Sequence, residues 1–510
     1  MKEGKYRYLF HNVALFTVSN FVSKVLVFCL VPFYTTVLTE SDYGVADVMQ
    51  TTLLLLVPLL SINAGEAALR FGLEYADSRD EILLYGFRKV VRSIAIVGTL
   101  AVALAVALSM APLQQMFLRI TGSSASSLPP YFLLFFLLYI CNSLYEYMLL
   151  YCQGTEQVQI MITGSVSCTL LVILSNLLFL LVFSMGLLGY LMAQMISFAG
   201  AFVLMFVLMG GMGRLRKAGK KEAVMDTRAE KPDGEKETPE SGEACPQNLE
   251  ERMGQYGKSM LLYSTASWVN NAIDRYYILF MLGSFQNGIY GVAYKIPAIL
   301  TTIQRIFAQA WQMSAVKEYK GPDRDQFFSG MYRAYQTVLV LSCSGIILFL
   351  KPIAAVMFRG GFFEAWVLVP PLLLSVVFGA LEGFLGSICL AFQDGKSMGR
   401  ATGVGALANI IMNYFGILEF GSFGAAIATL FSYFTMFVLA FIFVRKHVKL
   451  KVMIIRDLLA YLLILVESLL LIFNFKNYYI INAVIVLILA LLYLKEEIGI
   501  AKRLLSRSGR

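Results

Sequence analysis

The sequence predicts an all-helical, polytopic membrane protein, and three observations lead to that fold class. First, the 510 residues are 58% hydrophobic with a mean hydropathy of +0.69, and only 15% are charged, whereas a soluble domain has about 25% charged residues. Second, the apolar residues come in many runs of about 20, the length that a helix needs to cross about 30 Å of hydrocarbon. Third, basic residues fall mainly between these runs. Lipid is therefore the expected solvent for most of the chain.

The apolar runs predict about fourteen transmembrane helices. They cover residues 9–38, 46–69, 91–112, 129–150, 160–184, 187–212, 256–283, 287–315, 329–350, 365–392, 398–418, 421–444, 453–473 and 477–494. Segment 352–363, with Pro352 and Gly360-Gly361, is expected to be interfacial or re-entrant. When both termini are placed in the cytoplasm, nearly all Lys and Arg outside the spans lie on the cytoplasmic side, as the positive-inside rule requires.

A polar segment at residues 213–255 separates six spans from eight. It has few apolar residues, charges of both signs, Pro, Gly and Ser, which is typical of disordered connectors. We therefore expect a six-helix bundle over 1–212, a disordered cytoplasmic linker over 213–255, a second six-helix bundle over 256–444, and two extra transmembrane helices with a cytoplasmic tail over 445–510.

The two bundles are expected to be copies of one another. The sequence YGVA occurs at 43–46 and again at 290–293. In the sixth and twelfth spans, Gly186, Gly189, Ala193, Ser197 and Phe198 match Gly421, Gly424, Ala428, Ser432 and Tyr433 at the same spacing. Because six spans separate the copies, both have the same orientation and are related by an axis along the membrane normal. Transporters commonly bind substrate in a central cavity between such repeats.

Basic residues within spans are the main candidates for function. They include Lys24, Arg275, Lys295 and Arg305. Such a charge at the bilayer centre costs about 2.5–3.5 kcal/mol on insertion scales, so it is expected to face a cavity, a partner or a ligand. Snorkelling or structural ion pairing is the alternative, with Asp274 as an evident partner of Arg275. Polar residues that share their helical faces are Asn20 and Ser23 in the first span, Asn270, Asn271 and Asp274 in the seventh, and Gln309 in the eighth.

Two acidic residues within spans, Glu146 and Glu382, are candidates for binding a coupling ion or proton, with structural pairing as the alternative. The sequence shows no Gly-rich phosphate loop, no His–Glu metal pair and no nucleophile elbow. We therefore predict no catalytic residues, no metal site, no cofactor and no enzymatic activity. The net charge of +9 follows from membrane topology, so no nucleic-acid partner is expected.

The first span, from His11-Asn12 to Tyr43-Gly44, resembles the opening of polysaccharide flippases of the Wzx type. The segment from Ser264 to Tyr319 resembles them more strongly, through DRYYILFMLGSFQNGIYGVAYKIP and FAQAWQMSAVKEY. These flippases belong to the multidrug/oligosaccharidyl-lipid/polysaccharide exporter superfamily, together with multidrug extruders and murein lipid-precursor flippases. The resemblance includes the number of spans and covers nearly the whole chain except the linker.

The resemblance implies two helical bundles in the bacterial cytoplasmic membrane, with a cavity that opens alternately to each side. It implies export of an undecaprenyl-pyrophosphate-linked oligosaccharide from the inner to the outer leaflet, for O-antigen, capsule or exopolysaccharide assembly. Lys24, Arg275, Lys295 and Arg305 match the basic residues that would bind the pyrophosphate. The implied partners are this anionic lipid-linked substrate, membrane lipid, and a polysaccharide polymerase or glycosyltransferases.

Three alternatives stay open. A cation-coupled multidrug extruder of the same fold would tend to place a carboxylate in the first-span cavity, where this chain has Lys24. A murein-precursor or sporulation-type flippase would share the mechanism and differ in its lipid substrate. A polysaccharide polymerase or ligase would need a long external loop with catalytic acids or arginines, and the predicted external loops are short.

Overall fold

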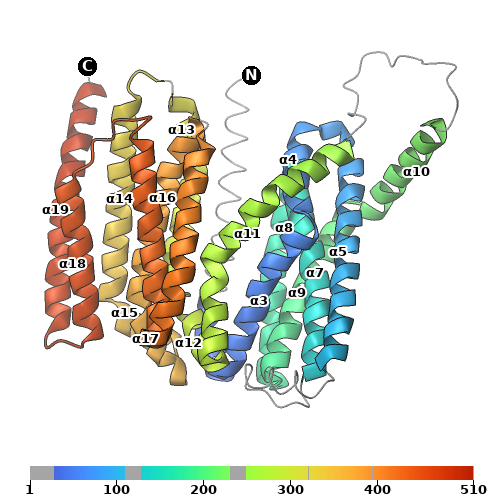
Figure 1. Ribbon diagram of the computed structural model, residues 1–510, viewed down its shortest axis with the longest axis horizontal. Coiled ribbons are helices and arrows are strands. Elements are labelled where there is room, and N and C mark those ends of the chain that lie inside the picture. Colours follow the sequence, from blue (N-terminus) through green and yellow to red (C-terminus); the bar gives the residue numbers. More distant parts are fainter. Residues whose placement is uncertain (1–27, 109–127, 230–248, 320, 393, 509–510) are drawn as a thin grey trace. The chain divides into compact units, whose positions relative to one another are not determined.

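The computed structural model describes residues 28–108, 128–229, 249–319, 321–392 and 394–508. Within these ranges the chain is almost entirely helical and has no strand (Figure 1). Seven helical segments of this described part are long and apolar enough to cross a membrane. Others carry more charge, as α18 does with Arg456, Asp457 and Glu467. The all-helical, polytopic fold class is thus confirmed.

Most predicted spans correspond to one helix each. They are α5 (Arg79–Leu108), α7 (Leu128–Gly154), α8 (Val158–Asn176), α9 (Gly186–Leu208), α11 (Leu249–Leu282), α14 (Arg324–Leu348), α16 (Val369–Ala391), α18 (Ile454–Ile472) and α19 (Tyr478–Ser508). The predicted second span, 46–69, differs, since it covers parts of two helices, α3 (Glu40–Leu60) and α4 (Ala64–Glu74), and the chain turns between them at Ile62 and Asn63, which have positive φ. A π-helical turn, η3 (Leu177–Val182), continues α8, and α2 (Val31–Val37) is the described end of the first span. Segment 352–363 falls in two short helices, α15 (Leu350–Met357) and η4 (Gly360–Leu368).

The eighth span differs from the prediction because it is two helices. α12 (Ser284–Ala293) ends before a turn at Tyr294–Ile296, and α13 (Pro297–Glu318) begins directly after it. Pro297 has no N–H to continue the hydrogen-bond ladder of α12, and proline is favoured at the first position of a new helix. The break places Lys295 at a helix junction rather than in mid-helix.

The eleventh and twelfth spans form one element, α17 (Gly395–Val444), with a sharp break at Gly421. The backbone of Gly421 has φ +59° and ψ −143°, which a residue with a side chain rarely adopts. On either side of the break the two halves touch through their backbones, since a Cβ on Gly424 would lie 1.8 Å from the carbonyl oxygen of Gly416. The two predicted spans are therefore antiparallel neighbours.

The backbone supports the internal repeat. Gly186, at the start of α9, has φ +53°, close to the φ +59° of its counterpart Gly421. The paired alanines of the repeat, Ala193 and Ala428, are both completely buried. Equivalent small residues thus occupy equivalent packed positions 235 residues apart, as a duplicated bundle requires.

The predicted linker, 213–255, differs from the expectation at both ends. Helix α10 (Gly211–Ala229) covers its beginning, and α11 starts at Leu249. Lys, Arg, Glu and Ala dominate these stretches, and all four are good helix formers even where no apolar core is available. Residues 230–248 lie outside the described residues.

The chain divides into two compact units, and two of the boundaries lie inside helices, after Gly44 in α3 and after Trp268 in α11. Unit 1 contains Val45–Trp268, and unit 2 contains Val31–Gly44 and Val269–Arg510. The first half of α11 is held in unit 1 because the Trp268 indole donates to the carbonyl oxygen of Thr51 at 2.8 Å. The division therefore falls inside α3 and α11 rather than in the polar segment.

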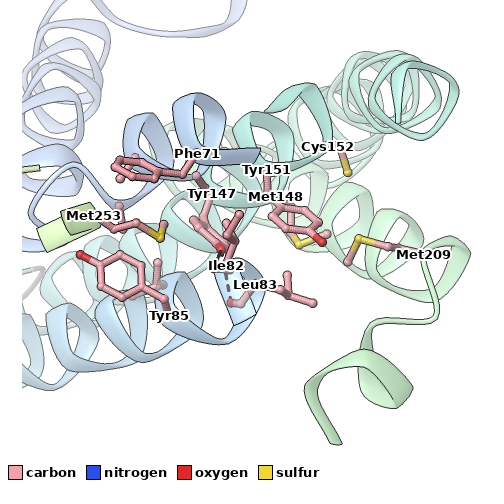
Figure 2. Close-up of a cluster of buried hydrophobic side chains, with 14 of the residues drawn as sticks. Phe71, Ile82, Leu83, Tyr85, Tyr147, Met148, Tyr151, Cys152, Met209 and Met253 are labelled. Carbon is pink, nitrogen blue, oxygen red and sulfur yellow. Dashed lines mark hydrogen bonds between the residues drawn. The ribbon is translucent and has the colours of Figure 1, made fainter. Parts of the chain in front are cut away.

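Unit 1 has an apolar core at the ends of α4 (Ala64–Glu74), α5 and α7 (Figure 2). The hydroxyl of Tyr147 donates to the carbonyl oxygens of Ile82 at 2.8 Å and Leu83 at 3.2 Å. Gly86 leaves room for this ring, since a Cβ there would lie 2.0 Å from it. Met253, from the start of α11, completes the cluster, so the first turns of α11 belong to this core.

Unit 2 is built around α16, which is buried along most of its length. The Trp311 ring stacks on Phe384 of α16 with centroids 4.1 Å apart, and its indole donates to the Phe384 carbonyl oxygen at 3.0 Å. The two extra helices, α18 and α19, pack together against α14 (Figure 1). Their outer faces expose a stripe that suits contact with lipid: Ile455, Leu458, Leu462, Leu465, Leu469, Ile480, Leu487 and Leu491.

Candidate cationic site

Arg275 lies in the second half of α11, within unit 2, and its side chain is only 13% exposed. Its Nη1 donates to the carbonyl oxygen of Asn271 at 2.9 Å and lies 3.6 Å from Oδ1 of Asp274. Its guanidinium lies over the ring of Tyr294, 4.6 Å from the centroid. The predicted pairing of Arg275 with Asp274 is therefore present, supplemented by a cation–π contact.

Asp274 is buried and connects three elements of unit 2. Its Oδ2 accepts hydrogen bonds from Tyr290 of α12 at 2.5 Å and from Tyr294 at 3.0 Å. The hydroxyl of Thr429, in the second half of α17, lies 3.5 Å from the same oxygen. Neutral hydroxyls therefore satisfy much of this carboxylate, and Arg275 is one of several partners.

Asn271 extends the polar cluster toward α17. Its Oδ1 accepts a hydrogen bond from the hydroxyl of Tyr433 at 2.9 Å. The Tyr433 ring packs on Gly379 of α16, where a Cβ would lie 3.0 Å from it. Asn270 is buried, and its Oδ1 has no hydrogen-bond partner among the described residues. Of the polar residues predicted on this face, Asn271 and Asp274 thus join Arg275 in one network.

Lys295 lies in the turn between α12 and α13. It is half-buried, and its ammonium lies 5.8 Å from the centroid of the Tyr43 ring. The two copies of the repeat differ at this position: YGVA continues as DVMQ from Asp47 and as YKIP from Tyr294. The second copy therefore has a lysine and a helix-breaking proline where the first has Val48 and Gln50, and α3 runs unbroken through them.

Arg305 is exposed on α13, with no hydrogen bond or ion pair to any residue that the structure describes. At about 1.5 Å of rise per residue it lies about 12 Å along the helix from its first residue. Gln309 follows one turn later on α13, and its side chain is not described. Lys24, Asn20 and Ser23 lie outside the described residues.

The two acidic candidates belong to different units. Glu146 is a half-buried residue of α7 in unit 1, and Glu382 is a half-buried residue of α16 in unit 2. Glu382 follows Gly379 by one helical turn and so lies near the Tyr433 ring. Glu382 is therefore close to the network around Arg275 within unit 2.

Four residues of this network were not predicted from the sequence: Tyr290, Tyr294, Thr429 and Tyr433. The internal repeat of the sequence could have pointed to two of them. Tyr290 opens the repeated YGVA, and Tyr433 is the one position of its motif where the copies differ, with Phe198 in the first. The added hydroxyl is the group that bonds Asn271. Thr429 carried no such signal.

Solved structures of membrane transporters have the same fold. No protein-family model matches the sequence, and no curated protein matches it. The lipid II flippase MurJ in its inward closed conformation aligns with a TM-score of 0.61 and 14% identity, over 96% of this chain and all of MurJ. An inward-facing multidrug resistance transporter of the MATE family aligns with a TM-score of 0.59 and 11% identity, over 83% of this chain and 94% of its own. A MOP superfamily transporter from Pyrococcus furiosus aligns with a TM-score of 0.55 and 10% identity, over 85% of this chain and 95% of its own.

These likenesses show the architecture of the chain. It has the multi-helix fold shared by the MurJ flippase and the MATE transporters of the MOP superfamily. Because the same fold serves lipid and drug substrates in those proteins, it does not distinguish between them.

Proposed function

We propose that the protein is a non-enzymatic flippase that moves an undecaprenyl-pyrophosphate-linked oligosaccharide from the inner to the outer leaflet of the bacterial cytoplasmic membrane. The observation that carries the proposal is the charge balance of unit 2. Arg275, Lys295 and Arg305 lie on consecutive elements of unit 2, and Asp274, which contacts Arg275, also accepts hydrogen bonds from two tyrosine hydroxyls. Three basic residues against one acid leave these elements with an excess of positive charge, which suits an anionic headgroup.

The proposed binding mode follows from this chemistry. A pyrophosphate carries at least two negative charges, and a partly dehydrated cation attracts it more strongly than one in bulk water. Arg275 is held by Asn271 and Tyr294, so its guanidinium is fixed in place before the ligand arrives. Arg305 is unpaired among the described residues and is free to engage a phosphate bidentately.

Transport would proceed by alternating access, with the isoprenoid tail in lipid while the sugar crosses between the bundles. We propose that both termini lie in the cytoplasm. Glycosyltransferases that build the sugar on the inner leaflet, and a polymerase that extends it outside, are the protein partners that this role requires. The 1–212 and 256–444 bundles would be the moving parts, with Lys24 as a further phosphate ligand.

A cation-coupled multidrug extruder is the second candidate. Glu382 favours it, because this half-buried acid lies near the Tyr433–Asn271 pair and could bind a coupling cation. A flippase for murein precursors or for a sporulation lipid is a third candidate. It would use the same cationic headgroup site as the proposed oligosaccharide flippase.

Reconstitution into lipid vesicles separates these functions. We expect movement of undecaprenyl-pyrophosphate oligosaccharide across the bilayer, measured by the access of an impermeant enzyme or quencher to the labelled sugar. The same vesicles should not accumulate a cationic dye when a proton or sodium gradient is applied. Dye transport without lipid movement would support the extruder, and movement of lipid II alone would support the murein-precursor reading.

A further inference from the structure

A buried acid lies outside the cationic site, in the interface between α14 and the two C-terminal helices. Glu467 of α18 is completely buried. Its Oε2 accepts a hydrogen bond from the hydroxyl of Ser344, a buried residue of α14, at 2.7 Å. It belongs to the inward stripe of α18, opposite the lipid-facing stripe that includes Leu462 and Leu465. The carboxyl therefore faces the protein interior.

A second acid on the same helix provides an internal comparison. Asp457 is also buried, and Oδ1 of Asp457 lies 2.9 Å from Nη2 of Arg456. It also lies 3.3 Å from the hydroxyl of Tyr493. No cation contacts Glu467 within the described part of the chain. Both buried acids of α18 therefore have a hydroxyl neighbour, and within the described residues Asp457 alone also has a cationic partner.

Two buried oxygens at this place have no hydrogen-bond donor among the residues that the structure describes. They are Oε1 of Glu467 and Oδ1 of Asn482, a completely buried residue of α19. Asn482 lies against Glu467, since its Nδ2 donates to the main-chain oxygen of Glu467 at 3.3 Å. Both oxygens are acceptors, and an ionised carboxylate offers no hydrogen to either. The interface thus has a surplus of acceptors and a deficit of donors.

A single proton on Glu467 would remove the buried negative charge and also supply a hydrogen-bond donor. A buried charge with no paired cation costs several kcal/mol even after relaxation of its surroundings. Protonation of Oε1 removes this charge and converts an unpartnered acceptor into an O–H donor. Ser344 still donates to Oε2 in the neutral carboxyl, so the existing hydrogen bond is kept.

We propose that Glu467 is a proton-binding site that fastens the α18–α19 pair to α14. The groups that face it are Ser344 and Cys343 from α14 and Asn482 from α19. Cys343 is the only other titratable group among them, and Asp457 is ten residues away along α18. Loss of the proton places an unpaired charge between the three helices and weakens their contact. This site is independent of the proposed transport function.

Infrared spectroscopy of the full-length protein in lipid nanodiscs tests the proton directly. A protonated carboxyl has a carbonyl stretching band that an ionised carboxylate lacks. We expect Glu467→Gln to remove one such band at neutral pH. The matched control is Glu364→Gln, which neutralises an exposed glutamate of η4 and should leave the band unchanged. An unchanged band in Glu467→Gln would show that the carboxyl is ionised and would overturn the proposal.

Two further measurements distinguish a proton from a bound metal cation and from a purely structural group. Replacing potassium by sodium should leave the Glu467 band in place. If sodium abolishes it, the oxygens form a sodium site instead and the proposal is wrong. The midpoint of thermal unfolding of the native protein should fall as the pH is raised, and Glu467→Gln, which retains Cys343, should show a smaller fall. If the unfolding midpoint falls equally in the two proteins, the pH effect belongs to other groups, and the proposed role of Glu467 in fastening the helices is wrong.

Discussion

The hydroxyl of Tyr290 donates a 2.5 Å hydrogen bond to Oδ2 of Asp274, and both residues are buried. This contact joins α12 to α11, and Tyr294 and Thr429 add the following turn and α17 through the same oxygen. Because Asp274 is held by neutral donors, it organises the helices around Arg275 without relying on the arginine alone. Asp274 is best understood as a positioning residue.

Removing this hydroxyl should loosen unit 2. Tyr290→Phe keeps the ring and leaves the Asp274 carboxylate with one donor fewer, and a hydrogen bond to a charged group contributes about 1.5–3 kcal/mol. We expect a clear drop in the thermal unfolding midpoint in detergent. The control is Tyr414→Phe, since Tyr414 is 48% exposed and its hydroxyl should contribute little. Equal midpoints for the two variants would show that the Asp274 network is not structural.

Gly44 and Gly288 mark a backbone contact between α3 and α12 within unit 2. A Cβ on Gly44 would lie 1.9 Å from the carbonyl oxygen of Ser284, and one on Gly288 would lie 1.8 Å from that of Glu40. Backbone atoms cannot rotate away, so we expect Gly288→Ala to destabilise the protein by about 1–3 kcal/mol, the usual cost of overpacking.

The matched control for this close approach is Gly330→Ala. Gly330 lies in α14 with no atom within 4 Å of the added Cβ, so alanine should be neutral there or stabilise the helix by up to about 1 kcal/mol. Thermal unfolding of the two variants side by side measures the difference. Comparable stability of Gly288→Ala and Gly330→Ala would show that α3 and α12 do not pack this closely.

Much of the fold could be predicted because lipid imposes a simple rule on sequence. A spanning helix needs a long apolar run, and these runs located most of the described helices. Their ends were less accurate, since α5 begins 12 residues before its predicted span and α19 ends 14 residues after its own. The repeat was visible because tight turns and close packing demand particular residues, such as glycine at 186 and 421, where φ is positive. The broken eighth span was missed because its apolar character continues across Tyr294–Ile296, and only Pro297 marks the break.

The site was harder to predict than the fold. Hydropathy identifies Arg275 and Lys295 as unusual, but it cannot show what surrounds them. Tyr290 and Tyr294 read as ordinary apolar residues of a span, and their hydroxyls matter only because α12 and α11 bring them to Asp274. Sequence separation hides Thr429 completely, since it lies 155 positions after Asp274 in the chain.

Acid should weaken a contact at the start of α17, outside the spans. Oδ2 of Asp394 lies 2.9 Å from Nε2 of His447, and Oδ1 accepts the Ser397 N–H at 3.2 Å. These hydrogen bonds lower the pKa of Asp394 to about 2, below the value of about 3.9 for an unfolded aspartate. The carboxylate therefore stabilises the protein fully above about pH 4, and this contribution is lost as the pH falls toward 2.

The Asp394→Ala variant measures this pH dependence. Its unfolding midpoint should lie below that of the native protein at neutral pH, and the difference should shrink as the pH is lowered from 5 to the lowest value that the protein tolerates. Asp323→Ala is the control, because Asp323 stands at the same position before α14 but makes no capping hydrogen bond with its side chain. A constant difference across the pH range would rule out an ionised, low-pKa carboxylate.

Cysteine labelling tests the proposed orientation with two ends of one element. Glu419 and Lys396 are both exposed, and they lie at opposite ends of the first half of α17. In a background with the seven native cysteines replaced, Glu419→Cys should react with an impermeant reagent in intact cells. Lys396→Cys should react only after permeabilisation. The reverse pattern would place the termini outside and contradict the orientation.

Neutralising Arg305 tests the cationic site most directly. Arg305 is exposed on α13, so Arg305→Ala should fold and insert normally, and loss of a cation should not impede insertion. If the guanidinium binds the pyrophosphate, its loss removes a charge-assisted contact of about 1.5–3 kcal/mol, which is about 10- to 150-fold in affinity. Arg305→Lys should retain more activity, since a point charge still binds phosphate. Lys24→Ala and Lys295→Ala should behave like Arg305→Ala.

The control for these variants is Arg400→Ala, which removes an exposed arginine near the start of α17 and should leave transport unchanged. Flipping is measured per inserted molecule in reconstituted vesicles, so that differences in expression do not enter. A structural role for Arg305 would appear as poor expression or instability with unchanged activity per molecule. Full activity in both Arg305→Ala and Lys24→Ala would refute binding of the pyrophosphate by these cations, and would favour the extruder, whose cationic substrates do not need them.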